Sequence, residues 1–460
     1  MGDDRVAAKP AQAARSDSGL WARLLVCLLA PGIVAWLMTS VWVPLETHQA
    51  EEYVALAQSP DAPASLLRPP GYVAFLRLVG GLDGGLRADD HGLIYLAQAV
   101  LLGLATAAFF LVARRWLEPA AACVLALAFG CHPLALVLVG YLHYDLLHLA
   151  LLVFTSWCLV NGFGSPRVSW PWVALAGVAA GLTTLTRPMT LVLPAVLAAA
   201  LGWRRGGEGR RCALAWAIFV VVMGLTLAPR TVGNFLRTGR VIPVNAQTGA
   251  AFWPMTDAVM HPTSENFPWV NEWHENGEPL AIRKLGPAAG GSDAFMTLTL
   301  PLDDLLKARA WELFRAQPAV YFENVAGNLL FFWTGDSRRF IKAFQFYQVA
   351  DRPSATDKWV IGYYVFASAV LHLLAAGGFI LAWWRRERTL VLAGSVFLTL
   401  WLVHALVYLD ARYLYAGLPF FLWFAAYGLR ELLPARWPRD LAACGALAAL
   451  SVIGCFALLA

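Results

Sequence analysis

The strongest constraint in this sequence is the repetition of apolar runs about 20 residues long, separated by short polar connections. A run of this length crosses the hydrocarbon core of a bilayer as an α-helix, in which the backbone polar groups are hydrogen-bonded internally. Charged residues make up only 14% of the chain. A soluble domain carries about a quarter, because its surface must be wetted. The sequence therefore predicts an all-α, polytopic membrane helix bundle.

We place about eleven transmembrane helices along the chain, with boundaries uncertain by a few residues. Their predicted spans are Leu20–Val43, Gly92–Ala113, Ala120–Val139, Tyr144–Val160, Trp170–Thr186, Pro188–Trp203, Cys212–Ala228, Trp359–Trp384, Thr389–Tyr408, Tyr413–Arg430 and Leu441–Leu459. The first run is too long for a signal-peptide core and has no small-residue cleavage site, so we expect it to be retained.

The arginines set the predicted orientation, because cytoplasmic loops carry an excess of basic residues. A cytoplasmic N-terminus places every basic cluster of the short connections inside. These clusters contain Arg114 and Arg115, Arg167, Arg204, Arg205, Arg210 and Arg211, Arg385, Arg386 and Arg388, and Arg430, Arg436 and Arg439. The abundance of Ala, Leu, Arg and Trp is typical of a GC-rich bacterial genome, so we expect a multi-pass protein of the bacterial inner (plasma) membrane.

This orientation divides the chain into four predicted regions. They are a cytoplasmic tail (1–19), a transmembrane region (20–228) with an external loop at 44–91, a large extracytoplasmic loop (229–357) and a second transmembrane region (358–460). Two short amphipathic stretches, Thr47–Gln58 and Pro70–Val79, lie in the first loop. Leu302–Phe314 and Val320–Trp333 have helical periodicity in the second loop. Helices of mixed polarity in such loops are expected at the membrane interface or as a cap on the bundle.

Carboxylates and basic residues gather on the predicted external face, from four separate connections. The first loop contributes Glu46, His48, Glu51, Glu52 and Arg68; the next external turn contributes Tyr141, His143 and Asp145; the later turns contribute Arg187, and Asp410 with Arg412. Charges so close to hydrocarbon are costly and often functional. The pattern suits transfer of a sugar from a lipid phosphate: arginines hold the phosphate by charge-assisted hydrogen bonds, while a carboxylate accepts the proton of the attacking acceptor.

Each of these signals also has a purely structural interpretation. An arginine beside a helix end is more often an interfacial anchor, Glu51 and Glu52 can form the wet face of an interfacial helix, and Asp410 and Arg412 can simply pair. The histidines lack metal-binding spacings such as H-E-x-x-H, so we predict no metal site from them. No cofactor is predicted, and the sequence leaves the use of a divalent metal open. The absence of a Walker loop and of a G-x-G-x-x-G unit argues against an ATP-driven or nucleotide-sugar enzyme.

Ordered landmarks from Val41 to Leu429 resemble the C-type glycosyltransferases, in particular the branch of dolichyl-phosphate-mannose protein mannosyltransferases and bacterial aminoarabinose lipid A transferases. The similar elements are Glu51–Ala57, Arg68–Tyr72, His132-Pro133 followed by Asp145, Gly181–Pro188, the start of the large loop from Pro229 to Thr248, and Arg412-Tyr413 with Pro419. The Leu-Thr-Arg-Pro element ending at Pro188 is the closest of these matches.

The resemblance implies a polyprenyl-phosphate-linked sugar donor, inversion at the anomeric carbon, and a first-loop acid as the catalytic base. It also implies contacts from Arg68 and Arg187 to the lipid phosphate. The candidate catalytic residues are therefore Glu51, Glu52, Glu46 and Asp145, the candidate phosphate ligands are Arg68, Arg187 and Arg412, and the candidate substrate contacts are Tyr53, Tyr72, His143 and Asn234. The expected partners are the lipid-linked donor, an acceptor that is a lipid, a glycan or a protein, and the bilayer, but no nucleic acid.

Two departures from the family pattern leave alternatives open. Gln49 occupies the position where the family usually has its first-loop aspartate, and Gly233 stands where the large-loop motif has an arginine. Besides a glycosyltransferase, the sequence is compatible with a lipid-binding relative that has lost catalysis. It is also compatible with a carrier or flippase of lipid-linked substrates, although transporters usually place polar residues at mid-membrane between repeated halves.

Overall fold

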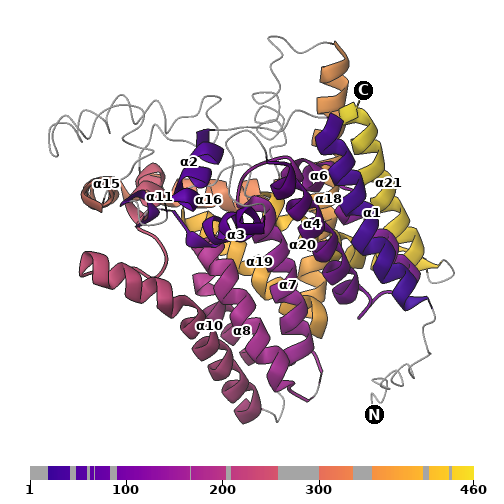
Figure 1. Ribbon diagram of the computed structural model, residues 1–460. Helices are drawn as coiled ribbons and strands as arrows, with labels where there is room; N and C mark the ends of the chain where they lie inside the picture. Colours follow the sequence, from indigo (N-terminus) through magenta and orange to yellow (C-terminus); the bar gives the residue numbers. More distant parts are fainter. Residues whose placement is uncertain are drawn as a thin grey trace.

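The computed structural model is a bundle of helices (Figure 1). It describes residues 19–41, 48–59, 63–66, 68–82, 91–165, 167–203, 209–256, 300–334, 355–407, 414–434 and 438–459. Within these residues all regular structure is helical and no strand occurs. The predicted fold class, a membrane helix bundle, is therefore confirmed.

The predicted transmembrane segments all have helical counterparts. These are α1 (Leu20–Val41), α4 (Gly92–Ala113), α5 (Pro119–Gly130) with α6 (Pro133–Val139), α7 (Asp145–Phe163), α8 (Trp170–Thr186), η2 (Pro188–Val192) with α9 (Leu193–Trp203), α10 (Gly209–Thr238), α18 (Ala355–Trp384), α19 (Arg388–Leu406), α20 (Leu414–Leu432) and α21 (Arg439–Leu459). Among the described residues, five helices are long and apolar enough to cross a membrane: α1, α4, α7, α10 and α19.

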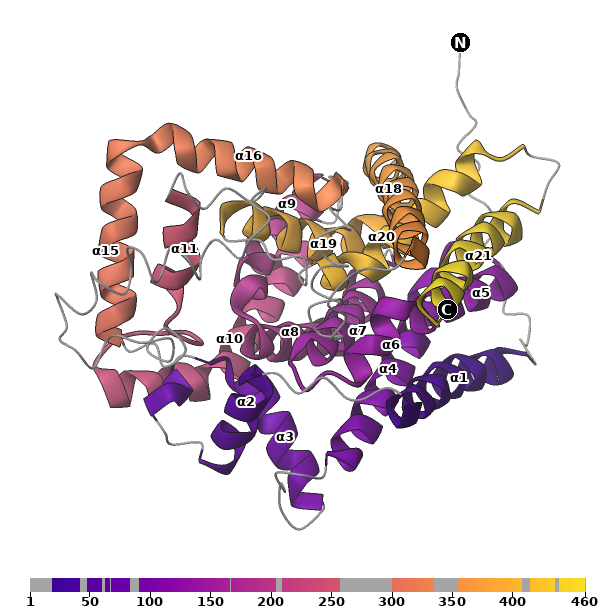
Figure 2. The same ribbon diagram turned by 90° about the horizontal axis from the view of Figure 1, so that it is seen from above.

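Four smaller helices, α2, α3, α15 and α16, follow the predicted amphipathic stretches, whereas η1 and α11 were not predicted. The first loop contains α2 (His48–Gln58), the short η1 (Pro63–Leu66) and α3 (Pro70–Leu82), while the large loop contains α11 (Thr248–Thr256), α15 (Leu300–Ala316) and α16 (Pro318–Thr334). Figure 2 shows α15 and α16 joined at a corner around α11, at the edge of the bundle. Their side-chain amides and hydroxyls fix this unit to the bundle, because Asn328 and Tyr321 donate to backbone carbonyls at the end of α19 and Asn324 donates to the end of α11.

Three differences from the predicted spans occur at prolines. The span Ala120–Val139 is broken at His132, because Pro133 lacks an N–H and disfavours helical backbone before it. The span Pro188–Trp203 begins with a 3₁₀ turn. In contrast, α10 continues through Pro229 to Thr238, beyond the predicted end at Ala228. The Thr231 hydroxyl donates to the Leu227 carbonyl within this continuous helix. The predicted division between 228 and 229 thus lies inside one helix.

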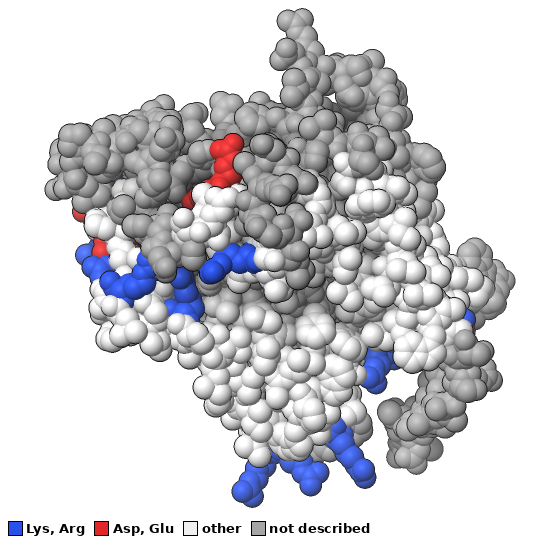
Figure 3. Space-filling view, in the orientation of Figure 1, with Lys and Arg blue, Asp and Glu red and all other residues white. Residues whose placement is uncertain are grey.

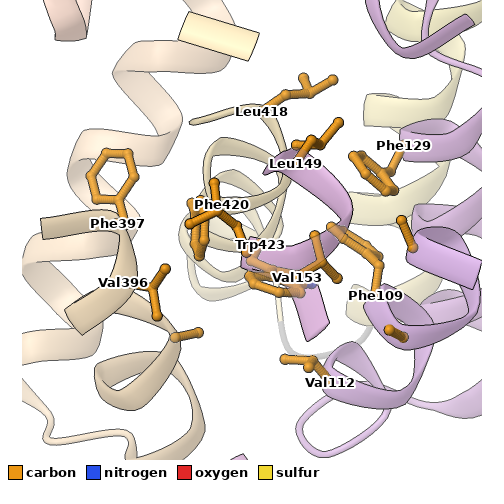
Figure 4. Close-up of a cluster of buried hydrophobic side chains, with 14 of the residues drawn as sticks. Phe109, Val112, Phe129, Leu149, Val153, Val396, Phe397, Leu418, Phe420 and Trp423 are labelled. Carbon is orange, nitrogen blue, oxygen red and sulfur yellow. The ribbon is translucent and has the colours of Figure 1, made fainter. Parts of the chain in front are cut away.

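A stack of aromatic rings joins the two halves of the chain in the core. The Phe109 ring of α4 lies 4.8 Å from Phe129 of α5 and 4.7 Å from Trp423 of α20, both nearly parallel to it (Figure 4). Phe397 of α19 packs beside Phe420 on the other side of the same helix. All of these side chains are fully buried. Contacts between the N-terminal and C-terminal helices therefore form one continuous core.

Small residues let the helix backbones approach closely. A Cβ on Gly103 of α4 would lie 2.1 Å from the Leu28 carbonyl of α1, and a Cβ on Gly378 of α18 would lie 1.8 Å from the Phe424 carbonyl of α20. Such contacts are typical of helix packing in membranes, where the hydrophobic effect does not drive apolar helices together.

Basic residues gather at the end of the bundle where α7 ends and α8 begins, which we call the basic end. Arg430 donates to Asp440 at 2.9 Å and to the Trp116 carbonyl at 3.0 Å, while Arg385 pairs with Glu431 and Arg115 with Asn161. Figure 3 shows a broad uncharged surface over α8 and α10, bounded by basic side chains at this end and by both signs of charge at the other. This arrangement is what a hydrocarbon layer around the bundle requires.

Replacing Trp423 with Ala is expected to destabilise the bundle, because a fully buried indole leaves a cavity among Phe109 and Phe420. Large-to-small changes of this kind cost about 3–5 kcal/mol. Trp384→Ala is the matched control, since that indole is 79% exposed on α18. Thermal unfolding of the purified variants in detergent checks this: similar midpoints for both would show that the aromatic stack contributes little.

Candidate functional site

The candidate site lies at the end of the bundle where α7 begins and α8 ends, opposite the basic end. Asp145 is the first residue of α7, where the helix dipole favours a negative charge. Arg187 follows α8 directly, in extended backbone with φ −154° and ψ 121°, because Pro188 prevents the helix from continuing. Both side chains are buried. Two antiparallel helices therefore bring one acid and one arginine to the same place.

Asp145 is held between two partners. His143 Nδ1 lies 2.8 Å from Oδ2 of Asp145, and Arg187 Nη1 lies 3.5 Å from Oδ1. The Arg187 guanidinium also lies 5.4 Å from the centre of the Tyr144 ring, within range of a cation–π contact. A buried carboxylate must be paired to remain charged, and these contacts supply the compensation.

A second ion pair comes from the first loop. Arg68 donates through Nε to one oxygen of Glu52 at 2.8 Å and through Nη2 to the other at 2.6 Å. Burial is the largest single effect and opposes the charged guanidinium, but the hydrogen bonds to Glu52, together with the charges of Tyr53, Glu52 and Tyr144, outweigh it and raise the pKa of Arg68. The structure thus joins two residues for which the sequence predicts separate roles. Their side chains are 15% and 17% exposed, so this pair is the more accessible part of the site.

Aromatic rings connect the two ion pairs. Tyr53 of α2 contacts Tyr72 of α3, His143 and Tyr144 edge to face, with ring centres 5.3, 5.8 and 5.9 Å away. Its hydroxyl is buried without a hydrogen-bond partner, and burial raises the pKa of Tyr53 well above its usual value, with Tyr144 adding to the effect. The Tyr72 hydroxyl is used structurally, because it donates to Gln98 at 3.0 Å.

Gly71 explains how the Arg68 element reaches Arg187. A Cβ on Gly71 would lie 2.5 Å from Oγ1 and 2.8 Å from Cα of Thr186, the residue before Arg187. The absence of a side chain lets the start of α3 rest directly on the end of α8. The two basic landmarks, 119 residues apart in the sequence (187 − 68), are therefore adjacent in the fold.

Two histidines of the site were not among the predicted site residues. His148 lies one turn after Asp145 on α7, fully buried, and neither of its ring nitrogens has a hydrogen-bond partner among the described residues. His404, in the last turn of α19, has Nδ1 2.7 Å from the Leu400 carbonyl. The charge of Arg187 acts on both rings. The only sequence signal for His148 and His404 was that each is a polar residue inside an apolar run.

Asn234 occupies a different part of this end. Its amide nitrogen donates to the carbonyls of Ile242 and Val244 at 2.8 and 3.1 Å. Arg230 donates to Val244 and to the Ser65 carbonyl, and Arg237 to the Ser65 hydroxyl. These contacts tie the end of α10 to η1, just before Arg68. The large-loop arginine of the family corresponds to Gly233 here, and Arg230 is not at that position. Arg230 thus has a structural contact with the first loop.

The remaining predicted residues divide into two groups. Glu51 is exposed on α2. Glu46, Asp410 and Arg412 lie outside the described residues, and so does the side chain of Gln49. Among the residues that the structure describes, no group of three or more His, Cys, Asp and Glu side chains is arranged to hold a metal ion.

Comparison with known proteins gives one family match. Residues 68–230 match the family described as dolichyl-phosphate-mannose-protein mannosyltransferase. This segment contains Arg68, Asp145 and Arg187. No curated protein matches the chain.

Solved structures give a fold match over most of the chain. The apo oligosaccharyltransferase of Archaeoglobus fulgidus aligns with a TM-score of 0.55 at 12% identity, covering 96% of this chain and 56% of that one. The same archaeal enzyme, AglB, in complex with an inhibitory peptide and a dolichol-phosphate, aligns at 0.50 and 12%, covering 95% and 55%. ArnT from Cupriavidus metallidurans bound to undecaprenyl phosphate gives 0.41 and 17%, covering 96% and 89%.

The chain spans about half the length of the archaeal enzyme, with which it shares the fold of the membrane helices. Together with the family match, this confirms the resemblance to the C-type glycosyltransferases that the ordered landmarks predict.

Replacing Gly71 with Ala is expected to push α3 away from α8, because the added methyl group meets the Thr186 backbone. Overpacking typically costs about 1–3 kcal/mol. Gly81→Ala is the control, since the same helix has nothing within 4 Å of that position. Thermal unfolding in detergent should show a lower midpoint for Gly71→Ala only; equal midpoints would mean that α3 moves without cost.

Proposed function

We propose that this chain is a membrane glycosyltransferase that moves a sugar from a polyprenyl-phosphate donor to an extracytoplasmic acceptor. The observation that carries the proposal is the pairing of two buried arginine elements with acids at one end of an apolar bundle. Arg68 and Arg187 come from separate connections and are brought together by the contact of Gly71 with Thr186. A lipid with its chain in the bilayer would present its phosphate at this level of the fold.

The arrangement suits the charge changes of the reaction. Guanidinium groups bind phosphate through charge-assisted, often bidentate hydrogen bonds, and they stabilise the negative charge that develops as the lipid phosphate leaves. Arg187 stays charged against Asp145, and Arg68 against Glu52, so both cations are in place before a ligand arrives. An acceptor that attacks the anomeric carbon from the face opposite the phosphate inverts its configuration and must lose a proton to a nearby base.

The donor class is supported by the comparisons. The family matched over residues 68–230 is described by a dolichyl-phosphate donor. The archaeal enzyme of similar fold has a solved structure in complex with a dolichol-phosphate. For this chain we infer a polyprenyl phosphate of the same kind, with undecaprenyl phosphate as the form to test in a bacterial membrane.

We also infer the location and orientation of the site. The basic end of the bundle fits the cytoplasmic side of a bacterial inner membrane, by the positive-inside rule. The end that carries Asp145, Arg187 and α2 then faces outward, and the reaction takes place on the external face with a lipid, glycan or protein acceptor.

Replacing Arg187 with Ala is expected to weaken the binding of undecaprenyl phosphate roughly 10- to 100-fold, the range for lost hydrogen bonds to a charged group. Release of undecaprenyl phosphate from undecaprenyl-phosphate-linked sugars should fall at least as far. Native mass spectrometry of the purified protein in detergent measures binding, and lipid mass spectrometry measures release.

Two variants control this experiment. Arg187→Lys keeps a charge against Asp145 but loses the planar fork, so it should fold and show an intermediate loss. Arg167→Ala removes an exposed arginine between α7 and α8 at the opposite end and should bind normally. Wild-type affinity in Arg187→Ala would refute the phosphate contact, and binding without release from any donor would favour a lipid carrier.

The orientation makes a separate prediction. In a cysteine-free background, Arg309→Cys on α15 should react with a membrane-impermeant maleimide added to intact spheroplasts, because this exposed position lies in the large loop. Ser165→Cys, exposed between α7 and α8, should react only after lysis. The reverse pattern would invert the proposed topology.

A further inference from the structure

We infer that the general base of the proposed reaction is the His143 imidazole, held in position by Asp145, rather than a first-loop carboxylate. The inference rests on the proposed function and assigns the proton acceptor within the same site. It starts from the ion pairs of Glu52 with Arg68 and of Asp145 with Arg187, and from one hydrogen bond, His143 to Asp145, at 2.8 Å.

The first loop offers a poor base. The position where the resemblance places an aspartate is Gln49, whose amide does not accept a proton at neutral pH. Both oxygens of Glu52 accept hydrogen bonds from Arg68. An acceptor hydroxyl would therefore have to compete with the Arg68 guanidinium for either oxygen of Glu52. Glu51, on the same helix, is exposed.

Asp145 is better suited to orient a base than to act as one. Its Oδ1 faces Arg187, and this cation favours the ionised carboxylate. Its Oδ2 is hydrogen-bonded to Nδ1 of His143. An ionised acid can only accept, so Nδ1 carries the hydrogen, and the neutral imidazole then has its lone pair on Nε2. A carboxylate that fixes the tautomer and stabilises the imidazolium is the arrangement used in histidine-based catalysis.

Aromatic rings hold the imidazole from several elements. Tyr144 and Tyr141 lie 3.9 and 5.0 Å from its centre, and Tyr53 of α2 lies 5.8 Å away. The charged groups around this cluster are Asp145 and Arg187 at the bundle and Arg68 and Glu52 from the first loop. His143 is only 2% exposed, so this cluster also shields the imidazole from solvent.

In the proposed step, one bond forms and one bond breaks at the anomeric carbon. The oxygen of an acceptor hydroxyl forms a bond to the anomeric carbon, while its proton passes to Nε2 of His143. The bond between the anomeric carbon and the phosphate oxygen breaks, and the electron pair leaves with the polyprenyl phosphate. The imidazolium that forms is stabilised by Asp145 and returns its proton to solvent after release.

The test compares His143→Gln, Asp145→Asn and Glu52→Gln in the purified full-length protein in detergent. Turnover is measured as release of undecaprenyl phosphate from its mannosyl, glucosyl and aminoarabinosyl derivatives, with a bacterial lipid extract as acceptor. Binding of undecaprenyl phosphate and thermal unfolding are measured in parallel. His372→Gln, a buried histidine that packs on Phe421 of α20, is the matched control.

Loss of a general base should lower turnover of His143→Gln at least about 100-fold, with undecaprenyl phosphate binding retained. The fall of the wild-type rate at low pH, where the imidazole becomes protonated, should persist in Glu52→Gln and disappear in His143→Gln. Asp145→Asn removes the charge that favours the imidazolium, so the fall of the rate should move to lower pH. This variant tests the pairing of His143 with Asp145 even if His143→Gln fails to fold.

Two outcomes would overturn the inference, and they differ. Turnover of His143→Gln within about threefold of wild type, or loss of the acidic limb in Glu52→Gln instead, would assign the base elsewhere while leaving glycosyl transfer intact. If the wild-type protein neither binds undecaprenyl phosphate nor releases it, the proposed function fails and the inference fails with it.

Discussion

The ion pair between Arg187 and Asp145 is the interaction on which the described site depends. Both charges are buried at the ends of two apolar helices, where either charge without its partner would be costly. Their pairing fixes the end of α8 against the start of α7, and with it the position of His143 and Tyr144. Arg68 and Glu52 form a second, more exposed ion pair. Arg68 precedes α3, which packs through Gly71 against Thr186, the residue before Arg187.

The helical framework was largely predictable, because the bilayer imposes one length and one hydrogen-bonding pattern on every spanning segment. Gly92–Ala113 and Trp170–Thr186 match α4 and α8 to the residue. The errors occur at prolines, whose effect depends on neighbours: Pro133 breaks its helix, whereas Pro229 lies inside α10. Hydrophobicity alone does not distinguish these two cases, since each proline adjoins an apolar run.

The proximity of some candidate residues was more predictable than the contacts that they make. The side of the membrane and the order of landmarks bring Asp145, His143 and Arg187 into one neighbourhood, and the structure places them in contact. The partner of Glu52 was not readable, because a bidentate pair between residues 16 apart depends on the turn that η1 makes between them. His148 and His404 were missed for a related reason: they come from helices that meet only through tertiary packing.

Because Gly71 and Thr186 are in contact, the side chains at these two distant sequence positions compete for the same small space. A larger residue at 71 can be accommodated only if 186 becomes smaller or the backbone there shifts, and a shift at 186 also moves Arg187. Substitutions at the two positions should therefore be coupled during evolution, and an alignment of related sequences should show them varying as a pair. Such covariation would record the close approach of α3 and α8 independently of any coordinates.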